Sequence, residues 1–142
     1  MKELLLIGFD DFAGNATAIN IANNTKALNV NVKIIPKYEY NKPVGSFLDD
    51  REFPAGHFLI DKIKLLTEEA QKKGPYTGPG LDDKYIIICN FDRNELDSII
   101  KTLSESGVTK DHIKAVLTPV NSCFSVSELA AELSKEHKAT RN

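Results

Sequence analysis

Cysteine is scarce in this sequence. The two that are present, Cys89 and Cys123, are too few to build a disulfide framework in a chain of 142 residues. Reduced thiols are the simpler expectation, and they suit a cytosolic protein. No apolar run approaches the length of a membrane span, and the run near the amino terminus is shorter than the apolar core of a signal peptide. The sequence therefore predicts a cytoplasmic protein that does not associate with membranes.

The sequence also lacks an excess of positive charge. Lysine and arginine number 18 against 20 aspartate and glutamate residues, which gives a formal net charge of −2. A domain that binds nucleic acid usually carries its cations on one basic face, and here the cations are scattered along the chain. We therefore expect no nucleic-acid partner.

Motifs for metals and cofactors are missing as well. The three histidines, His57, His112 and His137, are too far apart in sequence for metal-ligand spacing, and there is no Cys-x-x-Cys pair. The glycine-containing loop at residues 8–15 is neither a Walker loop nor a dinucleotide fingerprint. We predict no metal site and no cofactor.

What the sequence does contain is the pattern of one folded α/β domain, predicted over residues 1–142. Apolar residues make up 42% of the chain, which is typical of a globular protein. Short apolar runs predict strands, and apolar residues at helical spacing predict helices between them. The predicted strands are residues 4–9, 30–35, 85–91 and 114–117; the predicted helices are about 12–28, 56–73, 92–107 and 125–138.

These elements form two strand–helix–strand halves, approximately residues 1–55 and 84–142, joined by a helix and a Gly/Pro loop. Such units favour a four-stranded, mainly parallel sheet with helices on both faces. The alternative is a ferredoxin-like α+β sheet of two split units, whose halves run in opposite directions. In the first predicted helix the apolar residues Phe12, Ala16, Ile19 and Ala22 follow helical spacing.

The two halves also resemble each other in sequence. Residues 7–10 and 89–92 each read as an apolar residue, a small or polar residue, phenylalanine and aspartate. An internal repeat would explain this pattern. The alternative is that any strand–helix–strand unit needs an apolar strand, a residue that caps the helix and a residue that ends the second strand.

A binding site is expected where the strands end. In parallel sheets, ligands bind beyond the carboxyl ends of the strands. That edge would bring together residues 8–15, 36–45, 89–92 and 118–125, with a small-molecule or anion ligand. The candidate contacts are Asp10, Gly45, Asp92, Thr118 and Asn121. Helix capping offers another explanation for Asp92 and for either Asp10 or Asp11.

Two other functions stay open, and the sequence does not decide whether the protein is an enzyme. A homodimer is one, because residues 38–58 hold aromatic side chains in a stretch of little regular structure. These aromatic residues are Tyr38, Tyr40, Phe47, Phe53 and Phe58. A thiol-dependent enzyme is the other, because Cys123 precedes a predicted helix start that could activate its thiolate. The alternative for Cys123 is an unreactive loop cysteine.

The carboxyl-terminal part resembles a known family. Residues 114–121 read Lys-Ala-Val-Leu-Thr-Pro-Val-Asn, and residues 125–137 form a helix pattern that ends in Lys-Glu-His. Together with residues 84–103, these segments are similar to a family of small bacterial proteins named domain of unknown function thirty-seven eighty-three. Val120, Phe124 and Ser125 stand where the family usually has Thr, Trp and Thr. The resemblance implies a bacterial cytoplasmic protein and implies no particular activity.

Overall fold

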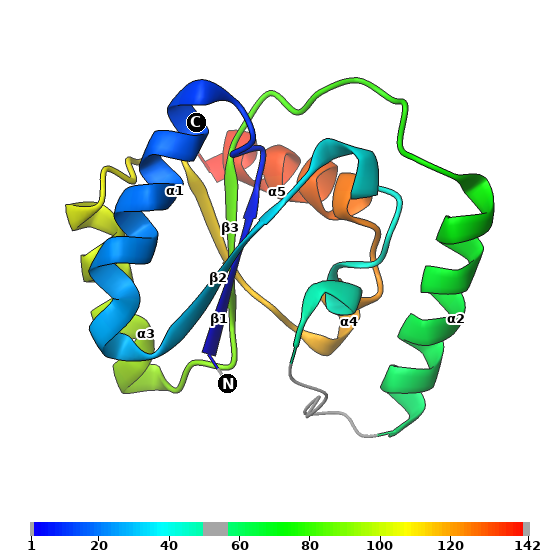
Figure 1. Cartoon of the computed structure of the whole chain (residues 1–142), viewed down its shortest axis with the longest axis horizontal. Coiled ribbons are helices and arrows are strands. Elements are labelled where there is room, and N and C mark those ends of the chain that lie inside the picture. Colours follow the sequence, from blue (N-terminus) through cyan, green and yellow to red (C-terminus); the bar gives the residue numbers. More distant parts are fainter. Residues whose placement is uncertain (1, 50–56, 141–142) are drawn as a thin grey trace. The chain divides into compact units, whose positions relative to one another are not determined.

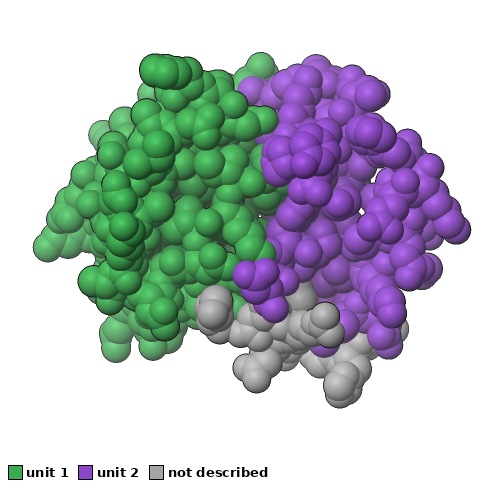
Figure 2. Space-filling view, in the orientation of Figure 1, with its two compact units in different colours: residues 1–35, 82–116 green, residues 36–81, 117–142 purple. Residues whose placement is uncertain are grey.

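The computed structural model describes residues 2–49 and 57–140 (Figure 1). The chain divides into two compact units, coloured separately in Figure 2. Unit 1 comprises residues 1–35 and 82–116, and unit 2 comprises residues 36–81 and 117–142. A single domain over residues 1–142 stays a prediction.

Unit 1 contains the whole sheet, and its strands lie where the apolar runs predicted them. Its elements are β1 (Lys2–Ile7), α1 (Phe12–Thr25), the 3₁₀ turn η1 (Lys26–Leu28), β2 (Val30–Ile35), β3 (Tyr85–Cys89), α3 (Arg93–Glu105) and β4 (Ile113–Val116).

The strand order in the sheet is β2-β1-β3-β4. β1 pairs with β2 in parallel and β3 pairs with β4 in parallel, while the central pair β1 and β3 is antiparallel. The α/β class and the mainly parallel sheet built from two βαβ halves are therefore confirmed. In each half the two strands are direct neighbours, so the units are not split as they are in a ferredoxin-like sheet.

The helices α1 and α3 cover the same face of this sheet (Figure 1). Right-handed crossovers that lead outward from two antiparallel central strands place both helices on one side. Strand side chains alternate between faces, so every second residue of β1 and β3 packs against these helices. The buried members of this core are Leu4, Leu6, Phe9, Ala18, Ile21, Ile86, Ile88, Ile99, Leu103 and Val108. Burial of each large aliphatic side chain contributes about 1.5–3 kcal/mol.

The helix α1 packs on the sheet through one of its two apolar faces. Ala18 and Ile21 face the core, whereas Phe12 and Ile19 are exposed. α1 carries apolar residues at helical spacing on two opposite faces, and spacing alone does not choose between them. The face that packs on the sheet is the one with Gly14, whose added Cβ would lie 2.6 Å from the Phe9 backbone.

Both helices of unit 1 begin with an aspartate cap. The Asp11 carboxylate accepts a hydrogen bond from the Gly14 N–H (2.6 Å), so the cap of α1 is Asp11. Asp92 and Glu95 form a reciprocal capping box at α3, with distances of 2.8 and 3.0 Å. Each cap satisfies backbone donors that would otherwise lack partners at a helix start.

Unit 2 is helical and irregular. Its elements are the 3₁₀ turns η2 (Lys37–Glu39) and η3 (Val44–Phe47), then α2 (His57–Lys73), α4 (Pro119–Ser122) and α5 (Val126–Thr140). The predicted irregular segment thus contains two short 3₁₀ turns. Gly74, with φ of +81°, ends α2 as expected for a glycine after a helix. No helix among residues 2–49 and 57–140 is long and apolar enough to cross a membrane.

The two chain segments of unit 2 are tied by backbone pairing. The Val44 N–H donates to the Phe124 carbonyl (2.9 Å), and the Val126 N–H donates to the Lys42 carbonyl (3.1 Å). Pro43 and Ser125 form an antiparallel bridge between these bonds. This ladder holds the chain before η3 against the start of α5.

Candidate functional site

The predicted meeting of Asp10 and Asp92 at one sheet edge is wrong. Because β1 and β3 run antiparallel, their carboxyl ends lie at opposite ends of the sheet. Asp10 follows β1 and Asp92 follows β3, so these two carboxylates do not share a site in unit 1. Gly45, Thr118 and Asn121 belong to unit 2.

Three acidic residues of unit 1, Asp11, Asp92 and Glu95, have structural partners. Asp92 caps α3, and Glu95 of the same capping box forms an ion pair with Lys2 (2.9 Å). The Asp92 backbone N–H and then Lys2 lower the pKa of Glu95. Lys84 forms an ion pair with Asp11 (2.9 Å), and this contact, followed by the Gly14 N–H, lowers the pKa of Asp11. These carboxylates stabilise the fold locally, as capping predicts.

The other three predicted residues lie near one another in unit 2. Gly45 is buried in η3, which packs against α4. Thr118 caps α4, since its hydroxyl accepts a hydrogen bond from the Asn121 N–H (3.1 Å). The Thr-Pro turn is thus the start of a one-turn helix, and its polar groups are used to shape that turn.

A cleft of about 130 Å³ opens beside this turn. Three chain segments of unit 2 form it: the stretch before η3, the last turns of α2 and the start of α5. Its apolar lining comes from Pro43, Leu66 and Ala70. Its polar lining comes from Asn41, Glu69, Lys73, Cys123, Ser125 and Glu128.

Three of the polar residues hold the walls of the cleft in place. The Asn41 side-chain amide donates to the Gly74 carbonyl (3.2 Å) and so links the stretch before η3 to the end of α2. Ser125 and Glu128 form a capping box at α5, with both distances 3.2 Å. Ser125, where the sequence predicts a helix to begin, is therefore the cap of α5. These bonds fix the cleft before any ligand arrives.

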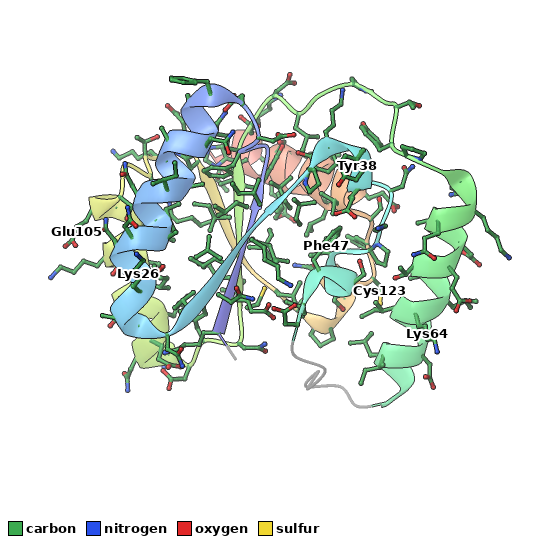
Figure 3. All side chains as sticks on the ribbon, viewed as in Figure 1. Lys26, Tyr38, Phe47, Lys64, Glu105 and Cys123 are labelled. Carbon is green, nitrogen blue, oxygen red and sulfur yellow. The ribbon has the colours of Figure 1, made fainter. Side chains whose placement is uncertain are left out.

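The other three polar residues have side chains available for a ligand. Glu69, Lys73 and Cys123 make no side-chain hydrogen bond or ion pair with any residue that the structure describes. Glu69 and Lys73 lie one turn apart on α2, and Figure 3 shows Cys123 between α4 and α2. A carboxylate, an ammonium group and a thiol thus border one small space.

The cleft residues on α2 were missed by sequence reasoning. Glu69 and Lys73 read as ordinary solvated positions of an amphipathic helix, and Asn41 reads as a loop residue. No local signal identifies them, because the cleft depends on pairing between residues 40–44 and 124–127, which are distant in sequence.

The two cysteines differ in environment. Cys89 is fully buried in β3, and burial, then the nearby Glu3 carboxylate, raise the pKa of its thiol. Cys123 is partly exposed in the cleft. Among the described residues, no group of three or more His, Cys, Asp and Glu side chains could hold a metal ion.

The aromatic segment proposed for dimerisation is partly internal to unit 2. Tyr40 is buried, and its ring lies 5.6 Å from that of Tyr76. Tyr38 is exposed, whereas Phe53 lies outside the described residues, as does the side chain of Phe58. Tyr40 thus acts as a core residue of its unit.

Comparison with known proteins gives a match to a protein family. No curated protein and no solved structure matches the chain. The segment from β3 to α5 carries the resemblance noted from the sequence and includes the Thr-Pro turn, Cys123 and the start of α5 beside the cleft. Residues 84–139 match the model of the family described as "Domain of unknown function (DUF3783)".

Proposed function

We propose that the protein is a small-molecule binding module and that its ligand occupies the cleft of unit 2. The observation that carries this proposal is the set of three available polar side chains, Glu69, Lys73 and Cys123, around one space. Convergent polar groups on a partly apolar lining are typical of ligand sites. The proposed site thus differs from the sheet edge predicted from sequence.

The volume of the cleft and the charges of its lining residues limit which ligands can bind. Its volume of about 130 Å³ lies below the roughly 300–1,000 Å³ of pockets for drug-sized molecules. Glu69 and Lys73 present opposite charges one helical turn apart, which favours a small molecule that carries both an anionic and a cationic group. An amino-acid-like zwitterion fits this description, with its carboxylate on Lys73 and its ammonium group on Glu69.

The walls support binding because they are already ordered. The backbone ladder between residues 40–44 and 124–127, the Asn41 bond to Gly74 and the Ser125 capping box hold the three segments together. A site that needs little ordering when a ligand arrives loses less affinity to conformational entropy.

A thermal-shift screen of the full chain tests the proposal. The probes are the free amino acids, with inorganic phosphate and nucleotides as further classes. A ligand that binds the folded state raises the melting temperature by mass action. We expect a concentration-dependent rise with at least one zwitterionic probe, and no rise with any probe would count against the proposal.

Neighbouring residues on α2 provide matched controls. Glu69→Gln and Lys73→Met remove the proposed contacts, while Glu68→Gln and Lys72→Met make the same changes at exposed positions that do not line the cleft. The first pair should abolish the ligand-induced shift and the second pair should retain it. Equal loss in both pairs would indicate a site elsewhere.

A thiol-dependent reaction at Cys123 is the second candidate, because its side chain lines the same cleft. Alkylation of the folded protein at neutral pH tests it, with the buried Cys89 as an internal reference that should not react. A rate for Cys123 no faster than that of an ordinary free thiol would remove this candidate.

We also propose a cytoplasmic location and an origin of the two βαβ halves by duplication. The two free cysteines support the first. The left-handed residues after β1 and β3, Gly8 and Asn90, support the second. The bacterial origin implied by the family resemblance stays a prediction.

A further inference from the structure

The outward face of α1 presents an exposed apolar stripe. Phe12 is 93% exposed and Ile19 is 60% exposed, and the exposed Ala16 lies between them. The spacing of four and then three residues places all three on one side of the helix. This side is opposite the one on which Ala18 and Ile21 pack against the sheet.

No charged residue lies on α1, although charged residues make up 27% of the chain. A surface helix usually carries charged residues on its outward face. Depletion of charge around exposed aromatic and aliphatic residues is instead typical of the core of a protein interface. An uncharged surface of this kind is best matched by another uncharged surface, since a charged partner would lose hydration without gaining an ion pair.

The order of side chains in the stripe makes it complementary to itself. Large residues, Phe12 and Ile19, stand at its ends, and the small Ala16 stands near its centre. If two copies of α1 cross antiparallel about a two-fold axis beside Ala16, then Phe12 of one copy faces Ile19 of the other. The alanines meet at the centre and allow the two helices to approach closely. Such an arrangement is isologous, as in most homodimers.

The area available is enough for a reversible dimer. A helix of 14 residues is about 21 Å long, and a phenylalanine alone buries about 150–250 Å². Two such stripes bury less than the roughly 1,200–2,000 Å² of a stable specific complex, which limits the dimer to a weak and reversible one. We propose that the protein forms a weak homodimer through the Phe12–Ala16–Ile19 stripe of α1. This surface is independent of the cleft in unit 2.

Sedimentation velocity of the full chain over a range of concentrations tests this proposal. The wild type should pass from monomer to dimer as its concentration rises. Ala16→Glu and Ala16→Lys each place like charges against each other at the centre of the interface, so each should weaken the dimer at least about tenfold, which corresponds to about 1.4 kcal/mol. An equimolar mixture of the two variants should restore a dimer, because the opposite charges then meet.

Ala13→Glu is the matched control, since Ala13 is exposed on the same helix but lies off the stripe. It should leave the dimer unchanged, and circular dichroism should show that all variants remain folded. A wild type that stays monomeric at every concentration overturns the proposal. So does a dimer that survives in both Ala16 variants, or one that Ala13→Glu disrupts equally.

Discussion

Gly8 and Asn90 occupy equivalent positions in the two βαβ halves of unit 1. Each is the first residue after a central strand, β1 or β3, and each has a left-handed backbone, with φ of +83° and +66°. The chain needs this conformation to turn from the strand toward the helix that follows. Each is followed by a phenylalanine, Phe9 or Phe91, that packs against the same core.

Replacement of these two residues by alanine should therefore destabilise unit 1 to different extents. Gly8→Ala introduces a Cβ on a left-handed backbone, which costs about 1–2 kcal/mol, whereas Asn90 already carries a Cβ, so Asn90→Ala loses only the better tolerance of asparagine for this conformation. Gly8→Ala also brings the new Cβ within 2.9 Å of the Asp83 carbonyl oxygen, so it should cost more than Asn90→Ala. Urea denaturation measures both changes. Equal losses in the two variants would contradict this difference.

The role of Asp92 as a cap can be separated from a role in ligand binding. Asp92→Ala removes the acceptor for the Glu95 N–H and should lower the free energy of unfolding by about 1 kcal/mol, whereas Asp92→Asn keeps an equally good cap. Chemical denaturation gives both values. Neither variant should alter ligand-induced thermal shifts, and a lost shift in Asp92→Asn would point to a direct contact.

The ion pair between Asp11 and Lys84 should make unfolding depend on pH in the acid range. Because the folded-state pKa of Asp11 is lowered, its stabilisation is complete above the unfolded pKa of about 3.9 and is lost as pH falls through the folded value. Lys84→Met should raise the Asp11 pKa, as followed by carboxyl carbon shifts in NMR. Lys101→Met, an exposed change on α3, is the control. An unchanged Asp11 pKa in Lys84→Met would contradict the pairing.

His112 should titrate below the ordinary histidine value. Its ring stacks on Phe9 with centroids 5.8 Å apart, and burial, followed by the charges of Lys84 and Lys114, lowers its pKa. The unfolded chain therefore binds more protons below about pH 6.5, so the free energy of unfolding should decrease as pH falls through that region.

Imidazole proton shifts in NMR measure the His112 pKa directly. Lys84→Met and Lys114→Met should each raise it part of the way toward its usual value, because burial remains. A His112 pKa above 6.5, the ordinary value, in the wild type would contradict the stated environment.

The sequence by itself determined the features of this protein that depend on neighbours along the chain. Apolar runs located the four strands, and an acceptor followed three residues later by glutamate located the starts of α3 and α5 at Asp92 and Ser125. These signals are local, because a strand period and a helix cap involve residues only a few positions apart. The α/β class follows from the order of those elements.

Features that depend on contacts between segments distant in sequence were decided only by the tertiary structure. The long connection between β2 and β3 allows either direction for the second half, so the reversal of β3 against β1 has no local signal. The same holds for α1, whose two faces are both apolar and whose core side is chosen by fit to the sheet. The cleft of unit 2 exists because residues 40–44 pair with residues 124–127, a contact that requires folding of the whole unit.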